Sequence, residues 1–270
     1  MRLVCELLGN SLELPACPRR IISLVSSATE TIVELGGGDR VIGVSPYCHR
    51  YVPELAAPVV GEYVTADIEA LRALQPDLIL LTTGIQAQLA QRLANAGLPA
   101  YALPLPASRF GILENIVTTG ALIGELPAAR ALANRLAAAA ETLMAQTPAV
   151  RPRVYTELWC GKYPRMVGGR CFVHDLIELA GGDNIFATNP GGYLPLDLPS
   201  VAASHPQTAI FFSEPEYPVS AAVLLTERGW NGLFSERVIE CGVEKGRNLI
   251  HDGPSYFATA AWLRTQLHNR

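Results

Sequence analysis

Charged residues are scarce in this chain of 270 residues, since only 17% are Asp, Glu, Lys or Arg and the formal net charge is −4. The sequence shows no cluster of Lys and Arg, so it lacks the electrostatic footprint of a nucleic-acid-binding surface. Long apolar runs are also missing, and none approaches the roughly 18 residues that a membrane-spanning helix requires. These absences exclude a nucleic-acid partner and a membrane span.

The motifs of several enzyme classes are missing as well. There is no G-x-x-x-x-G-K-[ST] loop, no G-x-G-x-x-G after the first predicted strand and no G-x-S-x-G elbow. The six cysteines, at 5, 17, 48, 160, 171 and 241, form no C-x-x-C pair and no zinc-like cluster. We therefore expect free, partly buried thiols, no metal site, no resident cofactor and no catalytic activity.

The N-terminal 20 residues lack the basic start, apolar core and small-residue cleavage site of a signal peptide. They are typical of a β-hairpin, with Gly9 and Asn10 in the turn between two strands. The sequence is compatible with two cellular locations. Either the protein remains in the cytoplasm, or the chain lacks a leader that directed its export.

Strands and helices alternate in the first part of the chain. Strands are predicted at 21–25, 41–44, 78–81 and 100–103, and helices begin near Thr29, Asp67 and Gln86. Ser26, Ser27 and Thr29 are predicted caps of the first helix, and the glycines at 36–38 end it. This alternation predicts a parallel sheet with helices on both faces.

The pattern is wholly helical at 109–146, where Pro127 marks the start of a second helix. That helix, of roughly 20 residues, is about 30 Å long. Alternation resumes from 151, with strands at 154–158, 208–212 and near 248–251, and helices at 173–180, at 220–227 and from about Tyr256. We predict an α/β fold of two Rossmann-like lobes, 1–108 and 149–270, joined by a helical connection at 109–148.

Polar and aromatic residues, with one glycine, follow or flank the predicted strands. They are Ser26, Ser27, Tyr47, His49, Arg50, Thr83 and Gln86 in the first lobe, and Trp159, Gly169, Arg170, Phe172, Glu216, Tyr217 and His251 in the second. Open α/β sheets bind ligands at the carboxyl ends of their strands, so these residues are candidates for ligand contact. The alternative is that the loops pack locally and that the serine hydroxyls cap a helix.

Six segments carry a resemblance to a known family. They are PRRIISLVSSATE at 18–30, DRVIGVSPY at 39–47, IEALRALQPDLILL at 68–81, GILENIVTTGALIGELPAARALANRL at 111–136, DLIELAGGDNIF at 175–186 and SVAASHPQTAIFF at 200–212. Together they resemble the periplasmic substrate-binding proteins of ABC transporters for siderophores, haem and cobalamin, and most closely the cobalamin-binding branch.

The resemblance implies two lobes joined by a long interlobe helix, with a cleft between them that binds a small molecule without catalysis. It implies a monomer in the periplasm or at the cell surface, whose ligand is cobalamin or a related corrinoid. Tyr47 matches a ligand-side tyrosine of cobalamin-binding relatives, and Tyr63 matches a stacking aromatic residue, so Tyr63 joins the candidate ligand-binding residues.

The same resemblance implies docking to an ABC permease through one acidic residue on each lobe. Glu69 matches the first position, whereas Pro199 stands at the second, where Asp197 is the nearest acid. Two alternatives remain. One is a haem or iron-siderophore ligand on the same fold, although only Arg50, Arg165 and Arg170 are placed to meet an anionic chelate. The other is a cytoplasmic corrinoid carrier, sensor or enzyme without a permease.

Overall fold

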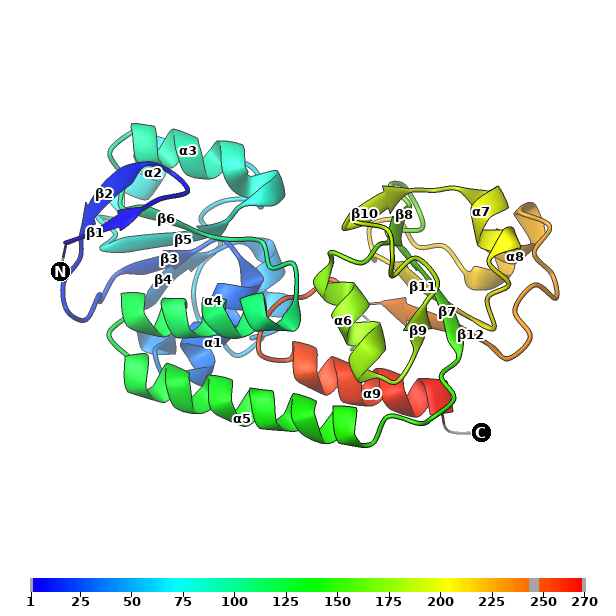
Figure 1. The fold of residues 1–270 in the computed structure, drawn as a ribbon. Coiled ribbons are helices and arrows are strands. Elements are labelled where there is room, and N and C mark those ends of the chain that lie inside the picture. The colour runs from blue at the N-terminus through cyan, green and yellow to red at the C-terminus, as the bar shows by residue number, and fades with distance from the viewer. Residues whose placement is uncertain (1, 243–247, 269–270) are drawn as a thin grey trace. The chain divides into compact units, whose positions relative to one another are not determined.

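The computed structural model describes residues 2–242 and 248–268 (Figure 1). The chain divides into two compact units. Unit 1 comprises Met1–Pro106 and Phe110–Leu136, and unit 2 comprises Ala107–Arg109 and Ala137–Arg270. The boundary falls inside helix α5 (Leu126–Ala145), so this helix contributes to both units. The separate helical connection at 109–148 stays a prediction.

Unit 1 contains the parallel sheet that the sequence predicts. Its strands are β3 (Ile21–Ser23), β4 (Val41–Val44), β5 (Leu78–Thr82) and β6 (Ala100–Leu103). Their order is β4-β3-β5-β6, and every neighbouring pair is parallel. Because the chain builds outward from β3 in opposite directions, the topological switch point lies between β3 and β5. A ligand site is expected outside the carboxyl ends of these strands.

Helices cover both faces of this sheet, which explains why every residue of β3 and β5 is buried. Figure 1 shows α2 and α3 over one face, and α1 and α4 over the other. The helices of the unit are α1 (Ser26–Glu34), α2 (Ile68–Ala73), α3 (Ala87–Asn95), α4 (Arg109–Leu122) and the first part of α5, with short 3-10 helices at η1 (Gly38–Arg40), η2 (Pro46–Arg50) and η3 (Gly84–Gln86).

Helix α1 begins earlier than the sequence predicts, and the predicted hydroxyl caps are wrong. Its N-cap is Val25, which makes no side-chain cap hydrogen bond, so Ser26 already lies in the first turn. The Thr29 hydroxyl donates to the Val25 carbonyl at 3.0 Å, inside the helix. The predicted stop is confirmed, because Gly36 has a φ of +77° and directly follows the last turn.

The N-terminal hairpin is present with a longer turn than predicted. Strands β1 (Arg2–Cys5) and β2 (Asn10–Glu13) pair antiparallel, and Cys5 is opposite Asn10. Residues 6–9 form the turn, so Asn10 belongs to the second strand. The Asn10 amide donates to the Ala100 carbonyl at 3.1 Å. The hairpin thereby satisfies part of the free edge of β6, which protects that edge from pairing with other chains.

The sheet of unit 2 is mixed, whereas the sequence predicts a parallel one. Its strands are β7 (Arg153–Leu158), β8 (Arg165–Val167), β9 (Asp183–Asn184), β10 (Tyr193–Pro195), β11 (Thr208–Ser213) and β12 (Arg237–Gly242). The order is β10-β8-β7-β11-β12, with β9 also pairing β7. Strands β7, β11 and β12 are parallel, whereas β8 is antiparallel to β7 and β10. The link from β7 to β8 is too short for a crossover, which forces the antiparallel pairing.

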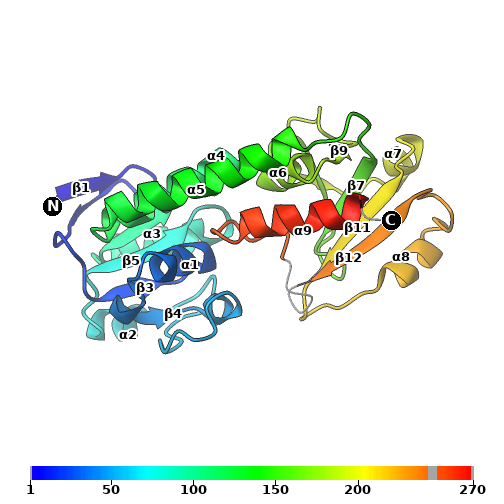
Figure 2. The same ribbon diagram turned by 90° about the horizontal axis from the view of Figure 1, so that it is seen from below.

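The strand predicted near 248–251 is wrong. The edge strand is β12, and 248–251 contains a turn instead. Figures 1 and 2 show α6 and α9 on one face of the sheet, and α7 and α8 on the other. These helices are α6 (Phe172–Leu179), α7 (Leu198–Ala203), α8 (Ala221–Glu227) and α9 (Tyr256–His268). Among the described residues, no helix has both the length and the apolar character to cross a bilayer.

Helices α2 and α7 repeat one local design. Asp67 and Asp197 are their N-caps, and each carboxylate accepts hydrogen bonds from the first turn. After each helix a residue has positive φ, namely Gln75 at +47° and His205 at +48°. A proline follows in both cases, and a buried parallel strand comes next. This repeat relates positions in one unit to positions in the other.

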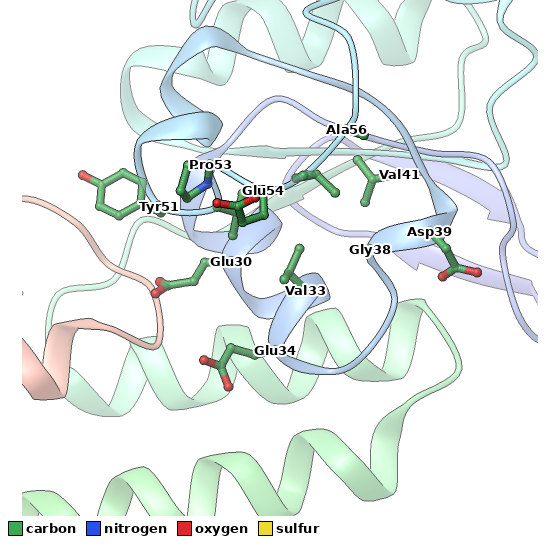
Figure 3. A pocket seen from close by; sticks show the side chains of 12 residues that line it. Glu30, Val33, Glu34, Gly38, Asp39, Val41, Tyr51, Pro53, Glu54 and Ala56 are labelled. Carbon is green, nitrogen blue, oxygen red and sulfur yellow. The ribbon is translucent and has the colours of Figure 1, made fainter.

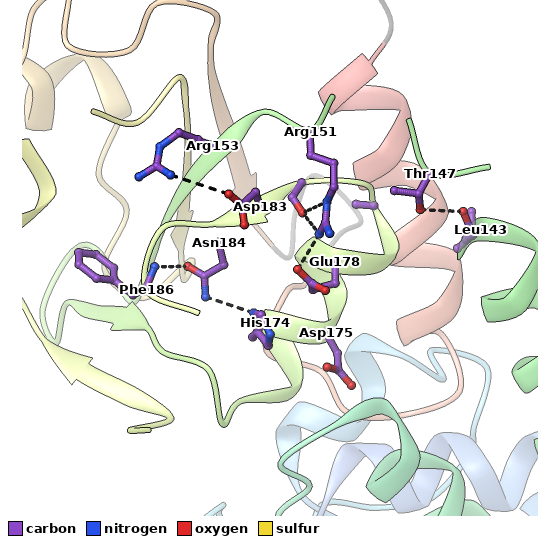
Figure 4. A network of polar contacts seen from close by, with 12 residues as sticks. Leu143, Thr147, Arg151, Arg153, His174, Asp175, Glu178, Asp183, Asn184 and Phe186 are labelled. Carbon is purple, nitrogen blue, oxygen red and sulfur yellow. Dashed lines mark hydrogen bonds and ion pairs between the residues drawn. The ribbon is translucent and has the colours of Figure 1, made fainter. Parts of the chain in front are cut away.

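The AGGDN motif at 180–184 has a structural role in unit 2 (Figure 4). Gly181, with a φ of +81°, follows the end of α6. The buried Asn184 side chain then donates to the Val167 carbonyl at 3.0 Å and accepts from the Phe186 amide at 3.1 Å. Arg151 donates to the Gly182 carbonyl at 2.9 Å. The motif therefore links α6, β8 and β9 within unit 2.

Candidate functional site

The carboxyl edge of unit 1 is defined here by the residues that follow β3, β4, β5 and β6. Tyr47 and Tyr63 meet at this edge, with ring centroids 5.5 Å apart and ring planes at 67°. The Arg50 guanidinium carbon lies 4.6 Å from the Tyr47 ring centroid. All three side chains are half-buried. The edge therefore presents an aromatic pair with a cation beside it.

Cys48 anchors the loop that carries Tyr47, His49 and Arg50. Its thiol is fully buried and lies 3.1 Å from the Thr29 hydroxyl oxygen, within hydrogen-bond distance. The Ser45 hydroxyl lies 3.3 Å from the same sulfur. Among the described residues, no group of three or more His, Cys, Asp and Glu side chains is arranged to hold a metal ion. The buried Cys48 side chain thus connects η2 to α1.

The Gln86 side chain stabilises this edge through hydrogen bonds with the backbone of three segments. Its amide nitrogen donates to the Leu24 carbonyl at 2.9 Å and to the Tyr63 carbonyl at 2.7 Å, and its oxygen accepts from the Thr82 amide at 2.9 Å. The side chain has no exposed surface. Gln86 therefore positions Tyr63, and this burial speaks against the direct polar contact with ligand that the sequence predicts.

The serines and Thr83 are also constrained. Ser27 is buried in α1, whereas Ser26 keeps part of its surface exposed. The Thr83 hydroxyl accepts a hydrogen bond of 2.8 Å from the Leu105 amide and so joins the loops after β5 and β6. Ser26 and Thr83 remain accessible, and Ser27 does not.

Sequence reasoning missed three apolar residues at the same edge. Ile85 follows β5 and is 72% exposed, Leu105 follows β6 and is 41% exposed, and Val64 adjoins Tyr63 and is 43% exposed. A cluster of exposed apolar side chains favours contact with an apolar partner, so these residues join the candidates for ligand contact. Ile85 could have been found from sequence, because it interrupts a polar loop just after a buried strand.

The carboxyl edge of unit 2 is defined by the residues that follow β7 and β11. Trp159 follows β7 with a φ of +54°, a backbone conformation that costs about 1 to 3 kcal/mol in a residue other than glycine. Its ring centroid lies 5.3 Å from that of Tyr193. Tyr193 lies on β10, far along the chain, so sequence reasoning did not pair the two. The strained tryptophan and its tyrosine neighbour form the second aromatic pair.

The loops after β7 and β11 contact each other closely. A Cβ added to Gly161 would lie 2.0 Å from the Tyr217 carbonyl oxygen, so only glycine fits there. Lys162 donates a hydrogen bond of 3.0 Å to the Tyr217 hydroxyl, and the rings of Tyr163 and Tyr217 flank it. Both tyrosines are exposed. Lys162 and Tyr163 are further residues that the sequence prediction did not include.

The remaining predicted residues of unit 2 differ in accessibility. Phe172 is 1% exposed, and its carbonyl accepts a hydrogen bond from Tyr256, so its ring belongs to the core. His251 is likewise buried. Gly169 closes a tight turn in which its amide donates to the Asn189 carbonyl at 2.8 Å, while Arg170 is exposed. Glu216 is also exposed. The burial of Phe172 and His251 speaks against the ligand contacts predicted for them.

A concave region of 910 Å³ lies in unit 1 between α1 and residues 51–56, and the predicted ligand-binding residues do not line it (Figure 3). Carboxylates surround its apolar floor, and they come from Glu30, Glu34, Asp39 and Glu54. Such a surface repels anions. It is therefore a poor site for an anionic ligand, and it shares no residue with the aromatic pair of Tyr47 and Tyr63.

The two predicted docking acids are not equivalent. Glu69 is exposed at the second position of α2 and pairs with Arg72. The corresponding position of α7 is Pro199, because Asp197 corresponds to Asp67 as the N-cap. The Asp197 carboxylate accepts hydrogen bonds from the amide and hydroxyl of Ser200, which lower its pKa. Asp197 is charged and exposed, but it also caps a helix.

Comparison with known proteins agrees with the resemblance noted in the sequence. A cobalamin-binding protein of Halobacterium salinarum is 34% identical over 186 residues, which cover 66% of this chain and 49% of that protein. The chain thus spans about half the length of that relative. A vitamin B12-binding protein of Vibrio campbellii is 28% identical over 199 residues, covering 70% of this chain and 69% of that protein.

The fold has solved counterparts. The apo form of a periplasmic heme-binding protein from Roseiflexus matches with a TM-score of 0.78 at 23% identity, covering 93% of this chain and 98% of that chain. The predicted two-lobed α/β fold is thereby confirmed. The family model of the periplasmic binding proteins matches residues 21–235, and the chain therefore belongs to the periplasmic binding protein family.

Proposed function

We propose that this protein binds cobalamin or a related corrinoid without catalysis, as the substrate-binding component of an ABC-type uptake system. The observation that carries the proposal is the presence of an aromatic pair at each carboxyl edge. Tyr47 and Tyr63 form the pair of unit 1, and Trp159 and Tyr193 form that of unit 2. Both pairs stand where an open α/β sheet binds its ligand.

The chemistry of each edge suits a large, flat macrocycle. Aromatic rings and the exposed Ile85 and Leu105 offer apolar area to the faces of the ring system. A corrinoid also carries amide side chains, which hydrogen-bond to hydroxyls and guanidinium groups. Ser26, Thr83, Arg50 and Arg170 are among the accessible predicted residues of that kind. Two relatives whose names state cobalamin or vitamin B12 binding support the same ligand class.

A haem or an iron-siderophore is the second candidate ligand. The exposed Arg170 and the half-buried Arg50 favour it, because guanidinium groups bind the carboxylates of such chelates. Isothermal titration calorimetry with cyanocobalamin, haem and a ferric siderophore separates these ligands. The proposal predicts micromolar or tighter binding of cyanocobalamin and weaker binding of the other two. Tighter binding of haem would transfer the function to the second candidate.

Docking to a permease forms part of the same proposal, with Glu69 and Asp197 as the acidic contacts of a monomer at the membrane surface. Their exposure and charge support this role. Ligand-stimulated ATP hydrolysis by the cognate transporter in proteoliposomes tests it. Glu69→Ala should reduce the stimulation, and Glu114→Ala, an exposed change on α4, should leave it unchanged. Equal stimulation by both variants would refute the assignment of Glu69.

A further inference from the structure

Lys162 is unusual among the cations of this chain, which contains two lysines against nineteen arginines. Its ammonium nitrogen lies 4.6 Å from the ring centroid of Tyr217 and 5.1 Å from that of Tyr163. It also donates a 3.0 Å hydrogen bond to the Tyr217 hydroxyl. Within the part of the chain that the structure describes, no carboxylate forms an ion pair with Lys162. Two tyrosines thus hold an exposed cation whose charge is not neutralised.

The backbone fixes the loop that presents this cation. The amides of Lys162 and Tyr163 both donate to the Trp159 carbonyl, at 3.3 and 3.1 Å, which closes a tight turn. Gly161 allows this turn to approach the Tyr217 backbone. The hydrogen bond with Tyr217 raises the pKa of Lys162, so the side chain is charged at neutral pH. The ammonium group therefore has a defined place between Tyr163 and Tyr217, in the turn that begins at Trp159.

The position of the Lys162 ammonium group beside aromatic rings favours a ligand that carries an anionic oxygen. The rings attract the ammonium group, but they supply no anionic oxygen to it. A ligand that covers this surface removes water from the ammonium group, and the lost hydration is then best replaced by a charged oxygen acceptor. Phosphate and carboxylate groups on the rim of a planar ligand meet this requirement.

We propose that Lys162 is a specificity-determining residue that binds an anionic oxygen, from a phosphate or a carboxylate, on the periphery of the ligand. This inference rests on the proposed function, because it requires a ligand at the carboxyl edge of unit 2. Cobalamin supplies a phosphodiester, cobinamide lacks that group, and haem supplies two carboxylates. The three compounds therefore distinguish the sources of the oxygen.

Calorimetry with cyanocobalamin and dicyanocobinamide tests the proposal on four proteins, namely the unchanged chain, Lys162→Met, Lys162→Arg and Arg130→Met. Arg130 is an exposed residue of α5, so its variant removes one positive charge away from the carboxyl edges. Lys162→Met should weaken cobalamin binding about tenfold and leave cobinamide binding unchanged. Lys162→Arg should retain most of the affinity, and Arg130→Met should retain all of it. Equal effects of Lys162→Met on both corrinoids, or none, would overturn the proposal.

Acetylation of lysine gives a second readout that does not depend on a variant. Bound cobalamin should slow acetylation of Lys162 at least several-fold by mass spectrometry, relative to a lysine-containing reference peptide in the same tube. Unchanged acetylation at saturating cobalamin would place Lys162 outside the site and refute the inference. If the protein binds haem but not cobalamin, the corrinoid function fails on its own. Weaker haem binding by Lys162→Met would then support the inference, and unchanged haem binding would overturn it. Binding of none of these ligands would overturn both.

Discussion

Loss of one partner from the buried ion pair between Glu157 and Arg228 should strongly destabilise unit 2. Glu157 lies on β7 with no exposed surface. Its oxygens accept hydrogen bonds from the Arg228 guanidinium at 2.5 and 2.8 Å, and from the Tyr155 hydroxyl at 2.5 Å. Burial and the neighbouring Glu157 charge raise the pKa of Tyr155, so its hydroxyl keeps the proton that it donates. Of the two side chains that donate to the fully buried Glu157 carboxylate, only Arg228 is thus positively charged.

Arg228→Met removes that cation but keeps most of the apolar stem. Breaking a buried pair from one side costs about 3 to 5 kcal/mol, because the remaining charge is left uncompensated. The Arg228 side chain is 10% exposed, so water reaches this end of the pair and the lower limit applies. Loss of its contact with the Trp230 ring, 5.2 Å away, adds to the cost. We expect the free energy of unfolding of unit 2 to fall by about 3 kcal/mol.

Urea unfolding followed by tryptophan fluorescence measures this change. The three tryptophans, Trp159, Trp230 and Trp262, all lie in unit 2, so the signal reports on that unit. The double variant Glu157→Gln/Arg228→Met should recover at least about 1 kcal/mol over Arg228→Met, because it removes the buried charge and keeps an acceptor for Tyr155. Arg165→Met, an exposed control on β8, should change the stability by less than about 0.5 kcal/mol.

The reasoning is refuted if Arg228→Met costs less than about 1 kcal/mol at an unchanged urea dependence. It is also refuted if the double variant is less stable than the single one. Either result would mean that the interior of unit 2 solvates the carboxylate without its arginine.

Further predictions concern the aromatic edge and the helix ends. Trp159→Ala should weaken cobalamin binding about 30-fold in calorimetry, as expected for a central aromatic contact, and an unchanged affinity would remove Trp159 from the site. Gly161→Ala should lower the free energy of unfolding by about 1 to 3 kcal/mol in the fluorescence assay, because the added Cβ would clash with the Tyr217 carbonyl. An unchanged free energy of unfolding would contradict the close approach. Replacing Gln75 and His205 by glycine should raise the melting temperature by about 2 °C per substitution, since both have positive φ and exposed side chains; a fall would show unrecognised contacts. Hydrogen bonds lower the pKa of Asp197 below its ordinary 3.8, so the stability it confers is present above that value and is lost as the pH falls through the folded-state pKa. An asparagine side chain caps a helix at any pH. The melting temperature of Asp197→Asn should therefore fall less than that of the unchanged chain as the pH is lowered. Equal falls in the two proteins would refute this.

The parallel sheet of unit 1 could be predicted because its strands are short, mostly apolar and separated by helical patterns. Residues 41–44 and 100–103 match β4 and β6 in full. The edge strand β12 escaped prediction because its residues alternate between exposed and buried, and Glu240 interrupts its apolar character. Strands β8 and β10 escaped because three residues carry too little pattern. Edge and hairpin strands depend on partners that local sequence does not show.

The sequence predicted where the candidate site lies, but not which of its side chains are accessible or contact each other. Loops after strands can be located from the pattern, which is why Tyr47 and Trp159 were selected. Accessibility depends on tertiary packing, so the sequence could not show that Gln86 and Phe172 are buried. The pairing of Trp159 with Tyr193 depends on the antiparallel β8 and β10, which were not predicted.

Calorimetric titration of the protein with cyanocobalamin tests the central claim most directly, with Tyr47→Ala and Trp159→Ala as paired variants. The proposed function predicts a single site of micromolar or tighter affinity in the unchanged chain. Each variant should weaken it by at least about tenfold, because each removes one stacking face. Absence of binding by the folded, unchanged protein, or full affinity in both variants, would contradict the account.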